Sequence, residues 1–172
     1  TAREAMGGPE AADLMIDCYM GWTKEYVLEM LPVLKEYSIK WVEEPIIPEH
    51  YDDYRRLRDI LNPHGILVTG GEHEFTRFGY RDIIRKGAVD ILQPDVGRAG
   101  GVTEVKRIID LASVYNVPVI IHGSNSPTYH VSLSSVNCSR CEYLDMKSSD
   151  LEVYFLGEPE PEDGCIRVPE AP

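Results

Sequence analysis

The sequence has 172 residues, of which 43% are apolar and 27% are charged, and its formal net charge is −12. This length suffices for one domain with a sizeable core, and no run of about 18 apolar residues predicts a transmembrane helix. The negative charge argues against nucleic acid or an anionic membrane as the main partner, and it favours a cytoplasmic protein that holds a cation.

Short apolar runs alternate with longer amphipathic segments along the chain. The runs are rich in Val, Ile and Leu, which predicts buried parallel strands. The predicted strands cover residues 13–17, 39–44, 66–72, 89–95, 117–123 and 141–145. The predicted helices cover residues 23–37, 50–61, 75–86, 101–115 and 127–136. Strands that alternate with helices predict an α/β fold in which helices lie outside a parallel sheet.

Two of these helices have specific support in the sequence. Thr23 can cap the first helix, and Pro32 predicts a kink inside it. The fourth helix has the clearest apolar stripe. That stripe consists of Val105, Ile108, Ile109, Ala112 and Tyr115. No linker or shift in composition marks a boundary, so residues 1–172 are expected to form a single domain.

Each predicted strand ends in a titratable side chain. In chain order these are Asp17, Glu43, Glu72, Asp95, His122 and Glu142. Their spacing is close to the length of one strand–helix unit, and the carboxyl ends of parallel strands share one rim, where βα-barrels carry their active sites. A role as cap of the next helix explains one such residue taken alone, but not six in series.

The first three of these side chains offer only oxygen atoms. Asp17, Glu43 and Glu72 would repel one another at a common point unless a hard cation neutralised them. Mg²⁺ takes octahedral oxygen ligation and keeps positions open for water or substrate. The three carboxylates therefore predict a Mg²⁺ site.

The remaining three side chains predict acid–base chemistry. A carboxylate beside an imidazole orients the ring and raises its basicity, so Asp95 is expected to orient His122, and His122 is expected to act as the base. Glu142 follows as a further acid or hydrogen-bonding group.

Polar residues next to these positions are candidate substrate contacts. His73 follows Glu72, and Ser124 and Asn125 follow His122 in a short polar loop. His73 could instead simply face its loop. Arg98 could pair with a substrate or with a glutamate.

The second strand ends in two adjacent carboxylates. Side chains alternate along a strand, so Glu43 and Glu44 are expected to point in opposite directions. Glu43 keeps register with the other predicted ligands, and Glu44 is expected to turn away.

The cysteines give a weaker signal. Cys138 and Cys141 form one C-x-x-C pair, but no second pair completes a zinc site. We therefore interpret them as structural or incidental thiols.

Six short motifs occur in a characteristic order: "LMIDCYMGW", "KWVEEP", "TGGEHE", "QPDVGRAGGVTE", "IHGSNS" and "CEYL". On these motifs the sequence resembles the C-terminal barrel domain of the enolase superfamily, in the mandelate racemase and muconate lactonizing enzyme group. Within it, the sequence is most similar to sugar-acid dehydratases of the L-rhamnonate dehydratase family. The resemblance covers nearly the whole chain and implies a partial (β/α)-barrel of the TIM type with about six strand–helix units.

The resemblance also implies roles for the strand-end residues. It makes Asp17, Glu43 and Glu72 the Mg²⁺ ligands and Asp95 with His122 the catalytic dyad, and it gives Glu142 a part in stabilising an enolate or binding substrate. The implied reaction removes the proton α to the carboxylate of a small sugar acid and eliminates water.

Two parts of the family pattern have no counterpart in the sequence: an N-terminal capping domain and the first two barrel strands. Six units cannot close a barrel that needs eight and about 250 residues. The chain is thus expected to be a fragment, a cut product or a part completed by a partner, and a homo-oligomer when full length. The alternatives to a dehydratase are a racemase, epimerase or cycloisomerase on the same scaffold, and an inactive barrel fragment.

Overall fold

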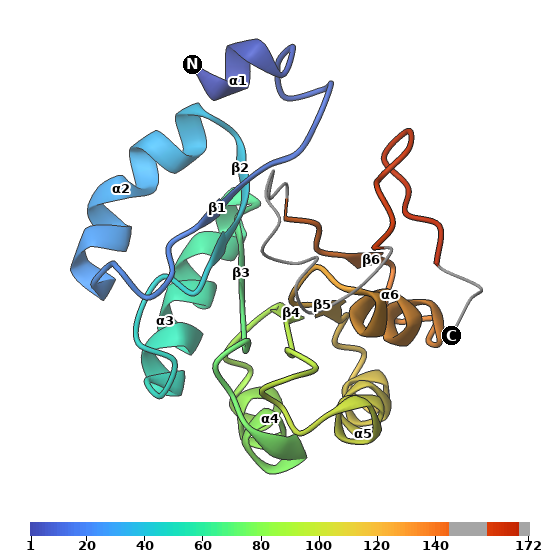
Figure 1. Ribbon diagram of the computed structural model, residues 1–172. Helices are drawn as coiled ribbons and strands as arrows, with labels where there is room; N and C mark the ends of the chain where they lie inside the picture. The colour runs from blue at the N-terminus through green and yellow to red at the C-terminus, as the bar shows by residue number, and fades with distance from the viewer. Residues whose placement is uncertain (145–157, 169–172) are drawn as a thin grey trace.

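The computed structural model describes residues 1–144 and 158–168, and within them strands and helices alternate as the sequence predicts (Figure 1). The strands are β1 (Leu14–Asp17), β2 (Ile39–Glu43), β3 (Leu67–Gly70), β4 (Ile91–Leu92), β5 (Ile120–Ile121) and β6 (Arg140–Cys141). The helices are α1 (Ala2–Ala5), α2 (Lys24–Glu36), α3 (Tyr51–Leu61), α4 (Thr76–Lys86), α5 (Val102–Val114) and α6 (Ser126–Leu133), with a 3₁₀ turn η1 (Asn62–His64) after α3.

The strands follow one another in sequence order, and all their pairings are parallel. One sheet has the order β1-β2-β3-β4, and a second pairs β5 with β6. Two isolated parallel bridges, Leu92 with Val119 and Asp95 with His122, connect β4 to β5. This arrangement of parallel strands with connecting helices is a partial (β/α)-barrel, which confirms the predicted fold class.

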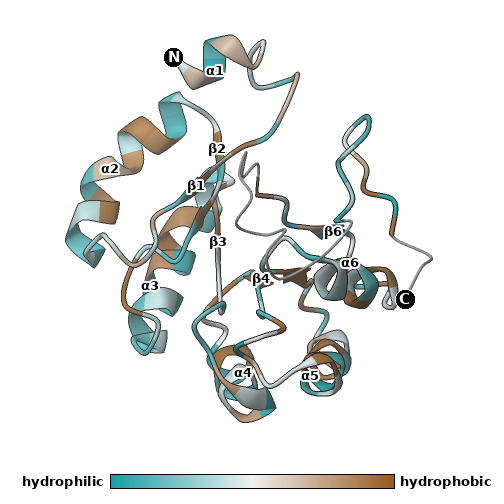
Figure 2. Cartoon of the chain, in the orientation of Figure 1, coloured by the Kyte–Doolittle hydropathy of each residue, from teal (hydrophilic) through white to brown (hydrophobic). Residues whose placement is uncertain are grey.

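Alternation along the strands separates two apolar layers. Val42, Val68 and Leu92 belong to the large core that the helices share with the strands. Their neighbours Trp41 and Ile91 form a second, smaller cluster with Ile120 and Leu67. The helices carry both apolar and polar segments (Figure 2), as expected for elements that cover one face of a sheet. The second layer is the interior side of the barrel wall.

The start of α2 agrees with the sequence prediction, and the end of α5 does not. The hydroxyl of Thr23 accepts a hydrogen bond from the backbone N–H of Tyr26 at 3.2 Å, which confirms the predicted helix cap. The apolar stripe of α5 is buried except for Tyr115, which is 51% exposed. The prediction for Tyr115 was wrong because α5 ends at Val114 and Tyr115 is its C-cap, beyond the last regular turn.

The N-terminal helix α1 was not predicted, and one buried side chain attaches it to the barrel. The guanidinium of Arg3 donates hydrogen bonds to the carbonyl oxygens of Tyr37 and Ser38, both at 2.9 Å, and of Ala12 at 2.7 Å. These carbonyls belong to the turn between α2 and β2 and to the segment before β1. A single charged side chain therefore satisfies three backbone acceptors at the amino-terminal end of the strands.

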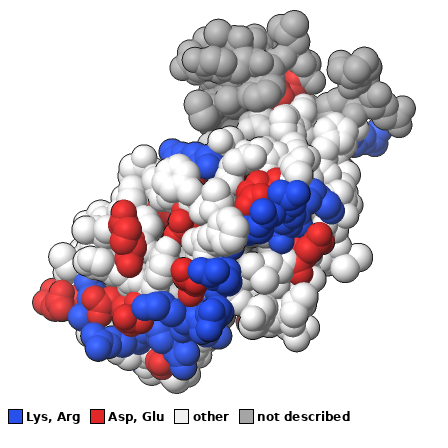
Figure 3. All heavy atoms as spheres, turned by 90° about the horizontal axis from the view of Figure 1, so that it is seen from below, with Lys and Arg blue, Asp and Glu red and all other residues white. Residues whose placement is uncertain are grey.

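Ion pairs connect neighbouring elements on the outer surface. Lys and Arg side chains lie among Asp and Glu side chains on the face that Figure 3 shows. Lys86 of α4 pairs with Asp52 of α3 at 2.7 Å, and Arg58 of α3 pairs with Asp90 at 2.6 Å. No helix in the described part of the chain is both long and apolar enough to cross a membrane.

Candidate active site

The strands bring the six predicted side chains to one rim of the barrel. Asp17 and Glu43 are the last residues of β1 and β2 and are partners in the strand register. Glu72 comes two residues after β3. Asp95 and His122 share a parallel bridge, and Glu142 directly follows β6.

His122 lies at the centre of a hydrogen-bonded chain of carboxylates. Its Nδ1 is 2.7 Å from Oδ2 of Asp95, and its Nε2 is 2.8 Å from Oε2 of Glu72. Glu142 Oε2 is 3.7 Å from the same Nε2 and accepts the backbone N–H of Gly123 at 2.7 Å. The structure thus brings four of the six predicted residues into one cluster.

The charges in this cluster shift the pKa values of its members. Burial disfavours the charged imidazole of His122, but hydrogen bonds to Asp95 and Glu72 outweigh burial and raise its pKa to about 10. Burial likewise opposes ionisation of Asp95 and Glu72, and the bonds to His122 nevertheless hold the pKa of both carboxyl groups below the usual value. In this arrangement the imidazolium acts as the counterion of the carboxylates.

Glu43 has a different electrostatic environment. It is buried, and burial raises its pKa to about 7; a hydrogen bond from Gln93 opposes the shift, while the charges of Glu142, Asp17 and Glu72 add to it. The buried oxygens Oγ1 of Thr69 and Oε1 of Gln93 have no hydrogen-bond partner among the described residues. An oxygen-rich position with excess negative charge and unpaired oxygens fits a hard cation such as Mg²⁺.

Asp17 is exposed, and its Oδ1 accepts the backbone N–H of Tyr19 at 2.8 Å. Asp17, Glu43 and Glu72 do not bring their ligand atoms together closely. Among the described residues, the acidic and imidazole groups with ligand atoms within 4.8 Å of one another are instead Glu44, Glu72 and His73. The assignment of Asp17, Glu43 and Glu72 as metal ligands therefore stays a prediction.

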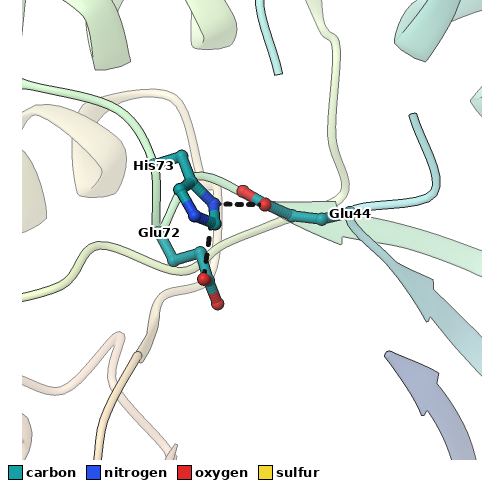
Figure 4. A group of neighbouring side chains, drawn as sticks. All are labelled: Glu44, Glu72 and His73. Atoms are coloured by element: carbon teal, nitrogen blue, oxygen red, sulfur yellow. Dashed lines mark hydrogen bonds and ion pairs between the residues drawn. The ribbon is translucent and has the colours of Figure 1, made fainter. Parts of the chain in front are cut away.

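Figure 4 shows the carboxyl groups of Glu44 and Glu72 directed at the ring of His73. Nδ1 of His73 is 2.6 Å from Oε2 of Glu44 and 3.3 Å from Oε1 of Glu72. Glu44 was expected to turn away from the site, because strand alternation was applied to a residue that lies beyond the strand. β2 ends at Glu43, and Glu44 has a φ of +35°, which turns the chain at this point.

The other candidate substrate contacts have partners within the protein. The hydroxyl of Ser124 is 2.8 Å from the hydroxyl of Tyr129, and Oδ1 of Asn125 accepts the N–H of Thr128 at 3.1 Å as the cap of α6. Their predicted role in substrate binding remains a prediction. Arg98 pairs with Glu72 at 3.6 Å, which is one of the two partners that the sequence left open.

Comparison with known proteins places these motifs in context. The model of the family described as "Enolase C-terminal domain-like" matches residues 1–172. A curated L-rhamnonate dehydratase from Saccharopolyspora erythraea is 39% identical over 165 residues, which are 92% of this chain and 42% of that protein. The chain therefore spans less than half the length of this relative.

Two crystal structures extend the comparison. A rhamnonate dehydratase from Gibberella zeae complexed with Mg aligns with a TM-score of 0.76 and 37% identity, over 83% of this chain and 34% of that one. The 3,6-anhydro-D-galactonate cycloisomerase from Zobellia galactanivorans aligns with a TM-score of 0.81 and 34% identity, over 94% of this chain and 46% of that one. The chain is thus similar to enzymes of more than one reaction type.

Proposed function

Because the chain belongs to the enolase C-terminal domain-like family, we propose that it forms the catalytic barrel of a Mg²⁺-dependent sugar-acid dehydratase of the L-rhamnonate type. One observation carries this proposal: His122 is held between Asp95 and Glu72 on the rim where the carboxyl ends of the strands meet. The similarity to two rhamnonate dehydratases supports the substrate class.

The predicted metal ligands are Asp17, Glu43 and Glu72. The raised pKa of Glu43 and the unpaired oxygens beside it fit this role, because a divalent cation would neutralise the excess negative charge. Bound Mg²⁺ would supply a Lewis acid that holds the substrate carboxylate and stabilises the negative charge that develops on it.

The proposed reaction begins at the carbon next to the substrate carboxylate. Glu72 pairs with Nε2 of His122 in the structure; if Glu72 held a cation, Nε2 would be free to accept the α proton. Asp95 keeps the ring oriented through Nδ1. The electrons of the broken C–H bond form a carbon–carbon double bond, and the neighbouring C–O bond breaks.

The leaving hydroxyl takes a proton from His122 and departs as water, and the resulting enol tautomerises to a 2-keto-3-deoxy acid. His122 thus returns to its starting state. Glu142 lies 3.7 Å from Nε2 of His122, where it can hydrogen-bond the reacting part of the substrate. We propose His73, Ser124 and Asn125 as contacts of the substrate hydroxyls.

The test is a screen of sugar acids on the protein at its natural length, with Mg²⁺, that measures formation of 2-keto-3-deoxy product. We expect turnover of at least one aldonate, loss of turnover on chelation and recovery when Mg²⁺ is restored. His122→Asn is expected to abolish turnover without unfolding the protein. Failure to turn over any aldonate would exclude the proposed dehydratase.

The similarity to a cycloisomerase favours a second candidate, an isomerisation on the same scaffold. A racemase or epimerase needs a second base on the opposite face of the substrate, and no Lys ends any predicted strand. Incubation in deuterium oxide separates these cases. Deuterium in recovered substrate without elimination of water would favour isomerisation over dehydration.

The domain organisation, assembly and location of the whole protein remain predictions. These are a single domain over residues 1–172, a homo-oligomer, and a cytoplasmic location in sugar-acid catabolism. The remaining alternative, an inactive barrel fragment, predicts that the chain turns over no sugar acid even with Mg²⁺ present.

A further inference from the structure

We propose that Glu44 is a positioning residue that fixes the imidazole of His73, so that Nε2 of His73 accepts a hydrogen bond from a substrate hydroxyl. This inference rests on the proposed function for the identity of the substrate. The Glu44–His73 pair itself rests on geometry that is independent of that function.

The carboxylate of Glu44 is built deeply into the protein. Glu44 is 1% exposed, its Oε1 accepts the backbone N–H of Gly71 at 3.2 Å, and its Oε2 lies 2.6 Å from Nδ1 of His73. Burying a carboxylate is unfavourable unless hydrogen bonds compensate for the lost water. Both oxygens of Glu44 have such a partner, which means that His73 is part of what makes this burial possible.

The backbone around Glu44 is held in an uncommon conformation. Its φ of +35° is unfavourable for a residue with a side chain. Two hydrogen bonds hold it there: the N–H of Glu44 donates to the carbonyl of Thr69 at 3.1 Å, and the carbonyl of Glu44 accepts the N–H of Met20. Strain maintained by surrounding structure is typical of functional positions.

The neighbouring strand leaves room for this side chain. A Cβ on Gly70 would lie 3.3 Å from Cγ of Glu44, a tight contact. Gly71 donates its N–H to Glu44 and has a φ of +120°, a backbone angle that residues with a side chain rarely adopt. The sequence "TGGEH" therefore combines the space for Glu44, one of its donors and the imidazole that it contacts.

The pair fixes which nitrogen of His73 faces the substrate. Carboxylates only accept hydrogen bonds, so Nδ1 of His73, the nitrogen that contacts both Glu44 and Glu72, is the one placed to donate, and Nε2 is the acceptor in that tautomer. Among the described residues, none bonds Nε2, and the side chain of His73 is 21% exposed. The ring of Tyr19 packs edge-on against the ring of His73, with 5.5 Å between the ring centroids, and restricts the rotation of the imidazole. Nε2 is then a fixed acceptor on the rim.

A metal ion shared by Glu44, Glu72 and His73 is the competing interpretation of this cluster. At 2.6 Å, Oε2 of Glu44 and Nδ1 of His73 are already at hydrogen-bonding distance. Mg²⁺ also prefers oxygen over imidazole nitrogen. The two interpretations differ in their prediction for metal affinity, which the experiment measures.

The experiment compares Glu44→Gln, His73→Asn and the double variant with Glu49→Gln, an exposed glutamate in the same loop, as the matched control. The Gln amide in Glu44→Gln can donate to Nδ1, which favours the opposite tautomer with the proton on Nε2. Nitrogen-15 NMR of histidine-labelled protein at natural length is expected to show the proton of His73 on Nδ1 in wild type and on Nε2 in Glu44→Gln. The His73→Asn variant assigns the signals. Glu49→Gln should leave both signals unchanged.

Kinetics and metal binding complete the test. Glu44→Gln is expected to lower kcat/KM about 10- to 100-fold, the usual cost of losing an orienting partner. The double variant should lose no more kcat/KM than His73→Asn does. The Mg²⁺ dissociation constant of Glu44→Gln, measured by calorimetry, should stay within about twofold of the wild-type value.

Three results would overturn the proposal: multiplicative kinetic losses, a loss of Mg²⁺ affinity in Glu44→Gln as large as in Glu43→Gln, or an unchanged tautomer of His73. If Glu44→Gln does not fold, Glu44→Asp, which shortens the reach to Nδ1, takes its place in each measurement. The NMR and calorimetric results hold even if no sugar acid is turned over, so a failure of the proposed function is distinguishable from a failure of this inference.

Discussion

Asp95 and His122 are paired twice, once through the backbone and once through their side chains. They are partners in a parallel bridge between neighbouring strands, and Oδ2 of Asp95 is 2.7 Å from Nδ1 of His122. The backbone pairing places the two side chains next to each other before any substrate binds. The other oxygen of Asp95 accepts the N–H of Arg98 at 2.8 Å, which ties the carboxylate to the following loop.

This arrangement makes Asp95→Asn a sharp test of the dyad. Oδ1 of the new Asn can still accept the N–H of Arg98, but its amide group replaces the oxygen that faces His122. The proton of neutral His122 is then favoured on Nε2, the nitrogen that must accept the substrate proton. We expect kcat to fall about 10³- to 10⁴-fold, the scale of the same change in a serine protease triad. Mg²⁺ affinity should change little, and an equal loss of Mg²⁺ binding would show that Asp95 acts through the metal site instead.

A second prediction concerns the two adjacent glutamates. Glu43→Gln is expected to abolish Mg²⁺-dependent turnover and to weaken Mg²⁺ binding at least 10-fold, because it removes a charged ligand. Glu44→Gln serves as the matched control and should retain Mg²⁺ affinity. Calorimetric titration of both variants with Mg²⁺ checks this, and equal losses of affinity would mean that the ligand assignment at the end of β2 is wrong.

Much of the fold could be predicted because its signals are local. The apolar runs and stripes located the described strands and helices within a few residues, and one titratable residue per strand end predicted the clustering around His122. The short N-terminal helix escaped prediction because Arg3 holds it through contacts distant in sequence. The strand predicted over residues 141–145 was wrong beyond its first residue, because β6 ends at Cys141 and residues 142–144 are irregular; residue 145 lies outside the described ranges.

The contact between Glu44 and His73 could not be predicted from strand periodicity. Alternation places Glu44 on the side opposite to Glu43, and this rule fails where the strand ends and φ becomes positive. The two glycines of "TGGEH" are the signal that could have indicated a close approach of another chain segment. Which partner approaches is a tertiary fact, determined by the register between β2 and β3.

A third prediction concerns stability and Asp90, away from the rim. Asp90 pairs with Arg58 at 2.6 Å and accepts hydrogen bonds from Asn62 and from the N–H of Val68. Asp90→Asn replaces one of the two acceptor oxygens with an NH2 group that faces a donor, so we expect the free energy of unfolding to fall by about 2 kcal/mol. Asp82→Asn, which affects an exposed pair with Arg81, should lower the free energy of unfolding much less. Urea titrations of both variants check this, and equal midpoints would contradict the role of Asp90 as a structural hub.

A fourth prediction concerns the reactivity of the thiols. Cys138 and Cys165 line the same cavity, but Cys165 is exposed, whereas burial raises the pKa of Cys138 to about 11 against a smaller opposing effect of Lys106. Only the thiolate reacts with iodoacetamide, and at pH 8 about a thousandth of Cys138 is in that form. We therefore expect Cys165 to be alkylated first and the rate at Cys138 to rise about tenfold per pH unit up to pH 10.

Mass spectrometry of timed samples measures both rates, and urea-unfolded protein is the control, in which the two cysteines should react similarly. A higher pKa lowers the thiolate fraction at every pH below it, so the difference between the cysteines must shrink as pH rises. Equal rates at pH 8 in the folded protein would show that partial burial does not protect Cys138. A difference that is as large at pH 10 as at pH 8 would mean that restricted access, and not the raised pKa, protects Cys138.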